Sequence, residues 1–433
     1  MSAALETRAE ILKLARLLEV DPEQLEFLRA ADASDLVALR EQVTDSLYSQ
    51  VGGPLQRLAS AAKLVPGGLA AAVAQRVMGP VLCARLAGVV DPSKAIEVAR
   101  HLPAPFLSDV AIHVDPRRAK TVIAKVPPAI VAQVGAELDQ RDEFVTMGRF
   151  VGFVGDDAIR AALPEISDSG LLQIGFVMEG KERLDYMIGL IPPERLPLIL
   201  HAAADLSLWP ELLDLFTHVG PELKGTIGDL AACDEELLDS LARAAGEEDL
   251  WDGVLPLVPV LSDLGRRRIA TMAARLDEPI LLQVIGAVEA NDMWSIFIPL
   301  AADYMDDDGR ARIAALVATV DQQLILTLAE AVERDRLWAQ LLQIAEQMRP
   351  DQLEPVADRL LSAGLEDRLP SLLAAVEETG LWETGLQMLA SLPEGLKARL
   401  APAAATLSEA ERRVVLEHAR ELGLTDQLSA VLS

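Results

Sequence analysis

Reactive side chains are scarce in this chain of 433 residues. Its two cysteines, Cys83 and Cys233, both lie in apolar surroundings, where a thiol usually acts as a small hydrophobe in a reducing compartment. None of the five histidines lies four residues from another. The sequence contains no nucleophile elbow, no glycine-rich phosphate loop and no calcium loop. We therefore expect no metal site, no cofactor and no enzymatic activity.

Basic residues are also few. Lysine and arginine number 39 against 67 aspartates and glutamates, so the net charge is −28. Binding of nucleic acid depends on basic side chains that neutralise phosphates, so this balance argues against it. An acidic surface keeps a protein dispersed and favours basic or cation-bearing partners.

Long uninterrupted apolar runs are missing as well. Residues 1–20 place Glu6, Arg8, Glu10 and Lys13 among apolar residues, which indicates an amphipathic helix and not a signal peptide. No run of eighteen or more uncharged apolar residues occurs. The sequence therefore predicts a cytoplasmic protein.

Small aliphatic residues dominate what is present. Hydrophobic residues make up 51% of the chain and aromatics only 4%, so alanine, leucine and valine supply the excess. These side chains suit close helix-on-helix packing. Many of the 25 prolines lie where helices would begin or end. We therefore expect an all-α fold.

The few tryptophans are regularly spaced. They are Trp209, Trp251, Trp294, Trp338 and Trp382, at intervals of 42, 43, 44 and 44 residues. A period of this size is typical of a helical solenoid, of which HEAT and armadillo repeats are examples. Because apolar residues at helical spacing are usually interior, we interpret the indoles as anchors between repeats. A role in lining a ligand surface is the alternative.

Residues 206–433 are expected to form three helices in each repeat, with the tryptophan on the first. The third helix should begin near Asp234, Asp277, Asp321 and Ser408, and Ser408 has capping-box spacing to Glu411. The repeat near residue 365 lacks an obvious capping residue. In the last copy Thr425 replaces the tryptophan, as expected for a C-terminal cap.

A shorter repeat occupies residues 91–138. Asp91-Pro92 and Asp115-Pro116 are 24 residues apart, and each is followed by a second proline, Pro103 or Pro127. This spacing predicts two short helices per unit, the first started by Asp-Pro and the second opened by the later proline. Residues 91–205 would hold such repeats and a junction.

This Asp-Pro and Leu-Pro alternation resembles the cytoplasmic N-terminal helical domain of MgtE-type magnesium transporters. The resemblance covers residues 91–138 and implies a superhelix of short helices. In that family the domain is acidic and helps to sense magnesium beside a membrane channel. The resemblance supports the architecture and transfers no binding site to this chain.

Two parts precede that repeat. Residues 1–57 predict two or three helices, one beginning at Asp21-Pro22 and another at Ser34 or Asp35. Residues 58–90 are the most apolar part, with a predicted turn at residues 66–68 and with Lys63, Arg76 and Arg85 as the only charges. One interpretation is a packed, alanine-rich helical hairpin. The other is a basic amphipathic segment that touches a membrane or lines an apolar pocket.

Taken together, the sequence predicts an all-α, right-handed α-solenoid of two- and three-helix repeats. The leading hypothesis is a non-enzymatic scaffold or adaptor that binds a basic protein partner on an acidic concave surface. The alternative is a membrane-peripheral protein that binds an apolar ligand or lipid through residues 58–90. An enzyme whose site is assembled from distant repeats ranks lowest.

Overall fold

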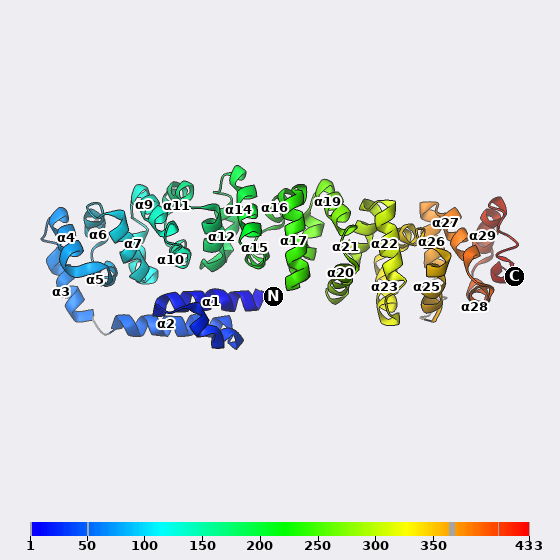
Figure 1. Ribbon diagram of the computed structural model, residues 1–433, viewed down its shortest axis with the longest axis horizontal. Coiled ribbons are helices and arrows are strands. Elements are labelled where there is room, and N and C mark those ends of the chain that lie inside the picture. The colour runs from blue at the N-terminus through cyan, green and yellow to red at the C-terminus, as the bar shows by residue number, and fades with distance from the viewer. Residues whose placement is uncertain (1, 50–51, 363–368, 406, 433) are drawn as a thin grey trace. The chain divides into compact units, whose positions relative to one another are not determined.

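The computed structural model describes residues 2–49, 52–362, 369–405 and 407–432, and every regular element in them is helical (Figure 1). The predicted all-α class is confirmed. The chain divides into two compact units, unit 1 (Met1–Ile227) and unit 2 (Gly228–Ser433). Their boundary lies inside a helix that follows Trp209, so this first tryptophan belongs to unit 1. The helix start expected near residue 365 lies outside the described residues.

Unit 1 consists of α-helices of 5 to 17 residues with a few 3₁₀ segments and one π-helical turn, η2. In chain order they are α1 (Ser2–Leu18), η1 (Pro22–Ala30), α2 (Ala33–Ser49), α3 (Gly52–Ala62), α4 (Gly67–Val73), η2 (Ala74–Met78), α5 (Gly79–Ala87), α6 (Pro92–Ala99), α7 (Ala104–His113), α8 (Pro116–Ile123), α9 (Pro128–Asp139), α10 (Phe144–Phe150), α11 (Asp156–Ala162), η3 (Leu163–Glu165), α12 (Asp168–Val177), η4 (Lys181–Arg183), α13 (Leu184–Ile188), η5 (Pro193–Arg195), α14 (Leu196–Asp205), α15 (Trp209–Thr217) and α16 (Pro221–Cys233), which crosses the boundary.

Unit 2 contains the remaining helices. They are α17 (Glu235–Glu248), α18 (Trp251–Val254), η6 (Leu255–Val260), α19 (Asp263–Ala273), α20 (Glu278–Ala290), α21 (Trp294–Pro299), η7 (Leu300–Tyr304), α22 (Asp307–Val317), α23 (Gln322–Asp335), α24 (Trp338–Ala345), α25 (Pro350–Ser362), α26 (Leu369–Thr379), α27 (Trp382–Ser391), α28 (Glu394–Ala404), α29 (Glu409–Glu421) and α30 (Ser429–Leu432). Within each unit the contacts mainly join helices that are near neighbours in chain order, such as α7 with α9 and α22 with α24.

The short repeat follows the predicted helix punctuation. Asp91 and Asp115 precede α6 and α8, and each carboxylate accepts hydrogen bonds from the first amides of its helix. Pro103 and Pro127 lie directly before α7 and α9. The first amides of a helix have no partner within the helix, so a carboxylate at the helix start can accept their hydrogen bonds. A proline there has no N–H group, so it leaves no donor unpaired. Residues 91–138 thus contain two pairs of short helices, α6 with α7 and α8 with α9, and an aspartate and a proline open the first helix of each pair.

The amphipathic N-terminal helix α1 docks inside unit 1. It contacts α10, α12 and α15, and Figure 1 shows it running beside that row of helices. Arg16 binds both carboxylate oxygens of Glu143 at 2.8 and 2.9 Å. Arg8 pairs with the buried Glu211 at 2.6 Å. Arg8 and Arg16 thus attach this helix to the rest of unit 1.

Behind α1 lies a buried ionic cluster. Glu10 accepts from Lys13 at 2.6 Å and from Arg40 of α2 at 3.0 Å, and Arg40 also reaches Glu179. Burial lowers the pKa of Lys13, and the Glu10 carboxylate opposes that shift. Removing one partner of such a cluster leaves a buried charge without compensation, so the cluster fixes the position of α2 against α1. Helix α2 begins at Ala33, slightly before the predicted Ser34 or Asp35.

Each tryptophan-marked helix begins at the tryptophan itself and follows the same tight reversal. The residue two positions earlier has a positive φ, from 51° to 72°; these residues are Ser207, Asp249, Asp292, Arg336 and Gly380. At the first four sites the next amide bonds to the carbonyl five residues back, at 2.8 to 3.1 Å. This is the Schellman arrangement, which ends one helix and redirects the chain. Gly423 has a φ of 69°, so the last copy keeps the reversal although Thr425 replaces tryptophan.

Four of the third helices have described starts, and these follow the predicted residues. Asp234, Asp321 and Ser408 cap α17, α23 and α29 with side-chain hydrogen bonds, and Ser408 with Glu411 forms the predicted capping box. Asp277 precedes α20 without a side-chain bond to its amides.

At the positive-φ residues before the tryptophans, adding a glycine should stabilise the protein and removing one should destabilise it. Arg336 is exposed with a φ of 57°, so Arg336→Gly should raise the free energy of unfolding of unit 2 by about 0.5–1 kcal/mol. Gly380→Ala should lower it by about 1 kcal/mol. As a control, Glu330→Gly in the middle of α23 should lower it by about 1 kcal/mol. Chemical denaturation checks all three, and a loss of stability in Arg336→Gly would contradict the assignment of strain to that residue.

Candidate functional site: an apolar pocket in unit 1

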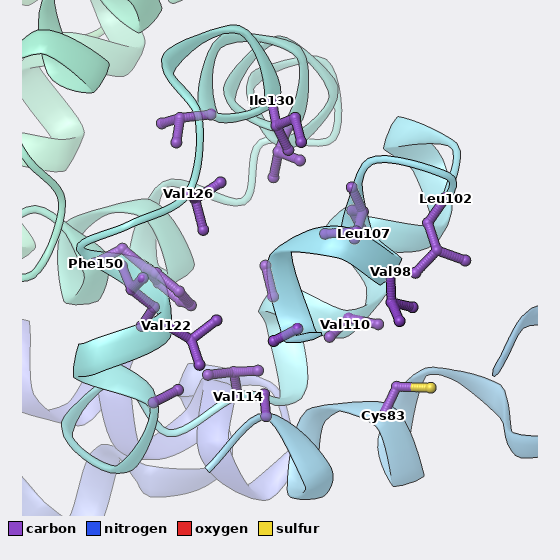
Figure 2. Close-up of a pocket in the computed structure, with 18 of the residues that line it drawn as sticks. Cys83, Val98, Leu102, Leu107, Val110, Val114, Val122, Val126, Ile130 and Phe150 are labelled. Carbon is purple, nitrogen blue, oxygen red and sulfur yellow. The ribbon is translucent and has the colours of Figure 1, made fainter. Parts of the chain in front are cut away.

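A large apolar pocket lies among the short helices of unit 1. Its volume is about 520 Å³, and its walls come from α3 through α13. Figure 2 shows valines and leucines of α6 to α9 pointing toward the space, with Phe150 of α10 and Cys83 of α5 at its sides. Many lining side chains are only half-buried, so the pocket is open to the surface.

The 24-residue repeat creates this lining. Equivalent residues of the two repeats line the pocket in pairs, namely Ala95 and Ala119, Val98 and Val122, Leu102 and Val126, Leu107 and Val131, Val110 and Val134, Ala111 and Gly135, and Val114 and Leu138. Most are short side chains on inward faces of their helices. Side chains this small do not reach across the space between the helices that face one another. A cavity therefore remains there.

Polar groups are nearly absent from the walls. Lys94 is the only charged residue among the described residues that line the pocket. Its ammonium group donates to the Val65 carbonyl at 2.5 Å and to Glu97 at 2.9 Å. Glu97 also accepts a hydrogen bond from the Gly67 amide at 2.8 Å. The hydrogen bond from Lys94, and after it the one from Gly67, lower the pKa of Glu97. Lys94 and Glu97 therefore attach the turn between α3 and α4 to α6.

Cys83 contributes a neutral thiol to the pocket. Burial raises its pKa to about 11. At neutral pH the nucleophilic thiolate is therefore scarce, and Cys83 acts as an apolar wall residue. In the part of the chain that the structure describes, no group of three or more histidines, cysteines or acidic residues is placed to hold a metal ion.

Residues 58–90 form one side of the pocket and not the closely packed hairpin of the first interpretation. They include the end of α3, then α4, η2 and α5, and the turn lies before Pro66, so Gly67 and Gly68 begin α4 instead of lying in the turn. Leu64, Leu69 and Val77 are exposed by 89%, 60% and 79%. One stretch, Gly67–Ala87, is long and apolar enough by composition to cross a membrane, and little of it is buried.

The tryptophans lie elsewhere. Trp209 is buried in unit 1 outside the pocket lining, and Trp251, Trp294 and Trp338 are buried in unit 2. Trp382 is half-buried and stacks on His418, with ring centroids 4.6 Å apart. Trp338 and Trp382 line a smaller apolar cavity of about 230 Å³ in unit 2. The structure therefore gathers none of the five into the unit 1 pocket.

The pocket itself was not predicted as a site. A signal for it exists in the sequence, since most inward positions of the 24-residue repeat are alanine or valine. Periodicity shows which face is apolar, but the same pattern describes a filled core equally well.

Comparison with protein-family models finds no match for this chain. Comparisons with curated proteins and with solved structures find no significant match either.

The raised pKa of Cys83 predicts slow alkylation. Relative to a thiol with the ordinary pKa of 9.0, a pKa of about 11 lowers the thiolate fraction at pH 8 about 100-fold. Iodoacetamide should therefore modify Cys83 far more slowly than the exposed Cys233, and the Cys83 rate should keep rising up to about pH 11. The variants Cys233→Ser and Cys83→Ser isolate the two thiols for mass spectrometry. Equal rates at pH 8 would contradict the buried, neutral state of Cys83.

Proposed function

We propose that the protein binds an elongated apolar molecule, such as the acyl chain of a lipid, in the pocket of unit 1. The observation that carries this proposal is a cavity of about 520 Å³ with a single charged residue among the described residues of its walls. Pockets for small ligands usually measure ~300–1,000 Å³ and are mainly apolar. The volume and chemistry of this pocket both fall within that description.

Water is a poor occupant of such a space. An ordered water needs two to four polar partners, and Lys94, the one charged lining residue, is already bonded to Val65 and Glu97. An apolar chain would release that water and bury its own surface. Folded proteins pack closely and leave few voids of this size, so the pocket favours a bound molecule over an empty space.

The lining also limits the class of ligand. Lys94 is the one charged group among the described lining residues, and its ammonium group is already bonded to Val65 and Glu97. A polar or ionic molecule would therefore lose its hydration while gaining few partners. The ligand should therefore be apolar over most of its length, with any polar group at the open edge. No catalytic step is part of this proposal.

A solenoid arrangement provides the framework for the pocket in this proposal. We propose that the two- and three-helix repeats stack as a right-handed superhelix of the HEAT or armadillo type. The recurrent left-handed reversals before each tryptophan and the contacts between helices near in chain order support it. Repeats of this kind bury their apolar faces on their neighbours.

A protein scaffold is the second candidate. The net charge of −28 and the repeats favour a basic protein partner. Affinity purification at low salt should then return a basic protein in stoichiometric amount that dissociates as the salt is raised. Recovery of the chain without such a protein at low salt would count against this candidate.

Filling the pocket should abolish ligand binding. The double substitution Val110→Trp/Val126→Trp places two indoles in the cavity, at positions that Figure 2 shows on its walls. We expect at least a ~10-fold loss of affinity for a long-chain fatty acid, because the acyl chain and the indoles need the same space. Calorimetric titration measures the affinity, and native mass spectrometry of the purified wild type should show a retained lipid.

The matched control is Leu198→Trp/Leu264→Trp, which adds the same two indoles at exposed positions outside the pocket. It should bind the fatty acid as the wild type does. The proposal fails if wild-type protein shows neither retained lipid nor fatty-acid binding, or if the filled variant binds as well as the control.

A further inference from the structure

Exposed apolar side chains are concentrated beside the pocket. Of the sixteen large hydrophobic residues that are exposed in the described chain, seven lie between residues 58 and 89. They are Leu58, Leu64, Leu69, Val73, Val77, Val81 and Val89. Scattered single residues of this kind are normal on soluble proteins, but a concentrated group usually marks an interaction surface.

The same segment carries a positive charge in an acidic protein. No aspartate or glutamate occurs between Asp45 and Asp91, and four basic residues do: Arg57, Lys63, Arg76 and Arg85. Within the described residues, none of these four makes an ion pair. Some exposed arginines of unit 2 differ in this respect, since Arg275, Arg334 and Arg399 pair with nearby carboxylates. The bases of residues 52–90 are therefore available to an external anion.

The backbone decides between a segment that spans a bilayer and one that lies on it. Gly79 has φ 73° and ψ 169°, far from helical values, so it interrupts the apolar stretch Gly67–Ala87. At about 1.5 Å per residue, neither side of Gly79 exceeds about 18 Å. The hydrocarbon core of a bilayer is about 30 Å thick. Each helix is too short to cross it, and both can lie in the interface.

The exposed surface is continuous with the pocket. Leu58 of α3 and Val73 of α4 are exposed by 45% and 42%, and both also line the cavity. An apolar chain that leaves a lipid layer at this surface would meet an apolar path into the cavity.

We propose that α3, α4, η2 and α5 form a docking surface for an anionic lipid bilayer, from which an acyl chain enters the unit 1 pocket between Leu58 and Val73. The basic residues attract the anionic headgroups, and the exposed leucines and valines insert among the upper acyl chains. This inference rests on the proposed function, because it names the source of the ligand. Charge complementarity selects the partner: an acidic protein with one cationic apolar face fits an anionic lipid layer.

Vesicle flotation with the full chain tests this docking. Wild-type protein should float with vesicles of phosphatidylglycerol and phosphatidylcholine and remain at the bottom with phosphatidylcholine alone. The triple variant Arg57→Glu/Lys63→Glu/Arg76→Glu should bind anionic vesicles at least ~100-fold more weakly, since each base near an anionic surface contributes several-fold to affinity. The charge-matched control Arg243→Glu/Arg268→Glu/Arg413→Glu changes three exposed arginines of unit 2 and should float as the wild type does.

A second pair of variants tests insertion. Leu64→Ser/Leu69→Ser/Val77→Ser should lose flotation, whereas Leu198→Ser/Leu264→Ser/Leu282→Ser, which removes three exposed apolar residues elsewhere, should keep it. Thermal unfolding shows that each variant is folded before it is compared. Equal flotation of the two sets overturns the docking surface. The docking surface is also overturned if the wild type self-associates, and if the Leu64→Ser/Leu69→Ser/Val77→Ser variant loses this self-association but floats as before.

The two proposals can fail separately. The filled variant Val110→Trp/Val126→Trp should still float with anionic vesicles but extract no lipid from them. The triple Glu variant should still bind a fatty acid supplied in solution. If the wild type binds a fatty acid but does not float, the docking surface is overturned and the pocket function stands. If it floats but binds no ligand, the pocket function is overturned and docking to the vesicle surface stands.

Discussion

Where one helix gives way to the next tryptophan-marked helix, an amide bonds back across a left-handed residue to a carbonyl five positions earlier. Leu208 bonds in this way to Ala203, and Leu337 to Val332, at 2.8 and 2.9 Å. Ala203 and Val332 are fully buried, so the bond anchors the reversal to the core. The same bond sets the direction in which the tryptophan enters the next helix. Because the reversal has one geometry, each repeat presents its indole at the same place in its own sequence of helices.

The two units differ in the side chains that occupy the space between their helices. In unit 2, large buried side chains such as Trp251, Trp294 and Phe297 occupy much of the space between helices, and a smaller cavity of about 230 Å³ remains. In unit 1, alanine and valine occupy the corresponding inward positions of α6 to α9 and leave a pocket. The packing lost there is offset in part by α1, which adds buried leucines and the ion pairs of Arg8 and Arg16 to the other helices of the unit. Binding surfaces commonly carry this compromise, because a fully packed core has no room for a ligand.

Much of the local structure could be predicted from sequence because helix ends depend on short-range chemistry. Asp91, Asp115 and Ser408 cap helices as predicted, and the tryptophan period coincides with helix starts. The turn at residues 66–68 was placed too late, because proline can precede a helix and the glycines after it are free to enter one. The bend at Gly79 was missed as well, although a positive φ at glycine is its physical cause.

The pocket could not be predicted in the same way. Its volume depends on the distances between helices, and those follow from packing across the whole unit and not from any one repeat. The exposure of Leu64 and Val77 could not be predicted for the same reason. Composition identifies an apolar segment but does not show which residues cover it. Sequence therefore identified residues 58–90 as unusual, and only the three-dimensional arrangement separates a packed hairpin from an open wall.

The chain carries one cysteine in each compact unit, and the two thiols differ in accessibility. Cys233 is exposed, whereas Cys83 has its pKa raised to about 11 by burial. A first fluorophore applied near neutral pH would therefore attach to Cys233, and a second applied under alkaline conditions would attach to Cys83. The natural sequence thus supports site-selective labelling with a donor and an acceptor dye. Energy transfer between them would follow the separation of the two units in solution as lipid is added.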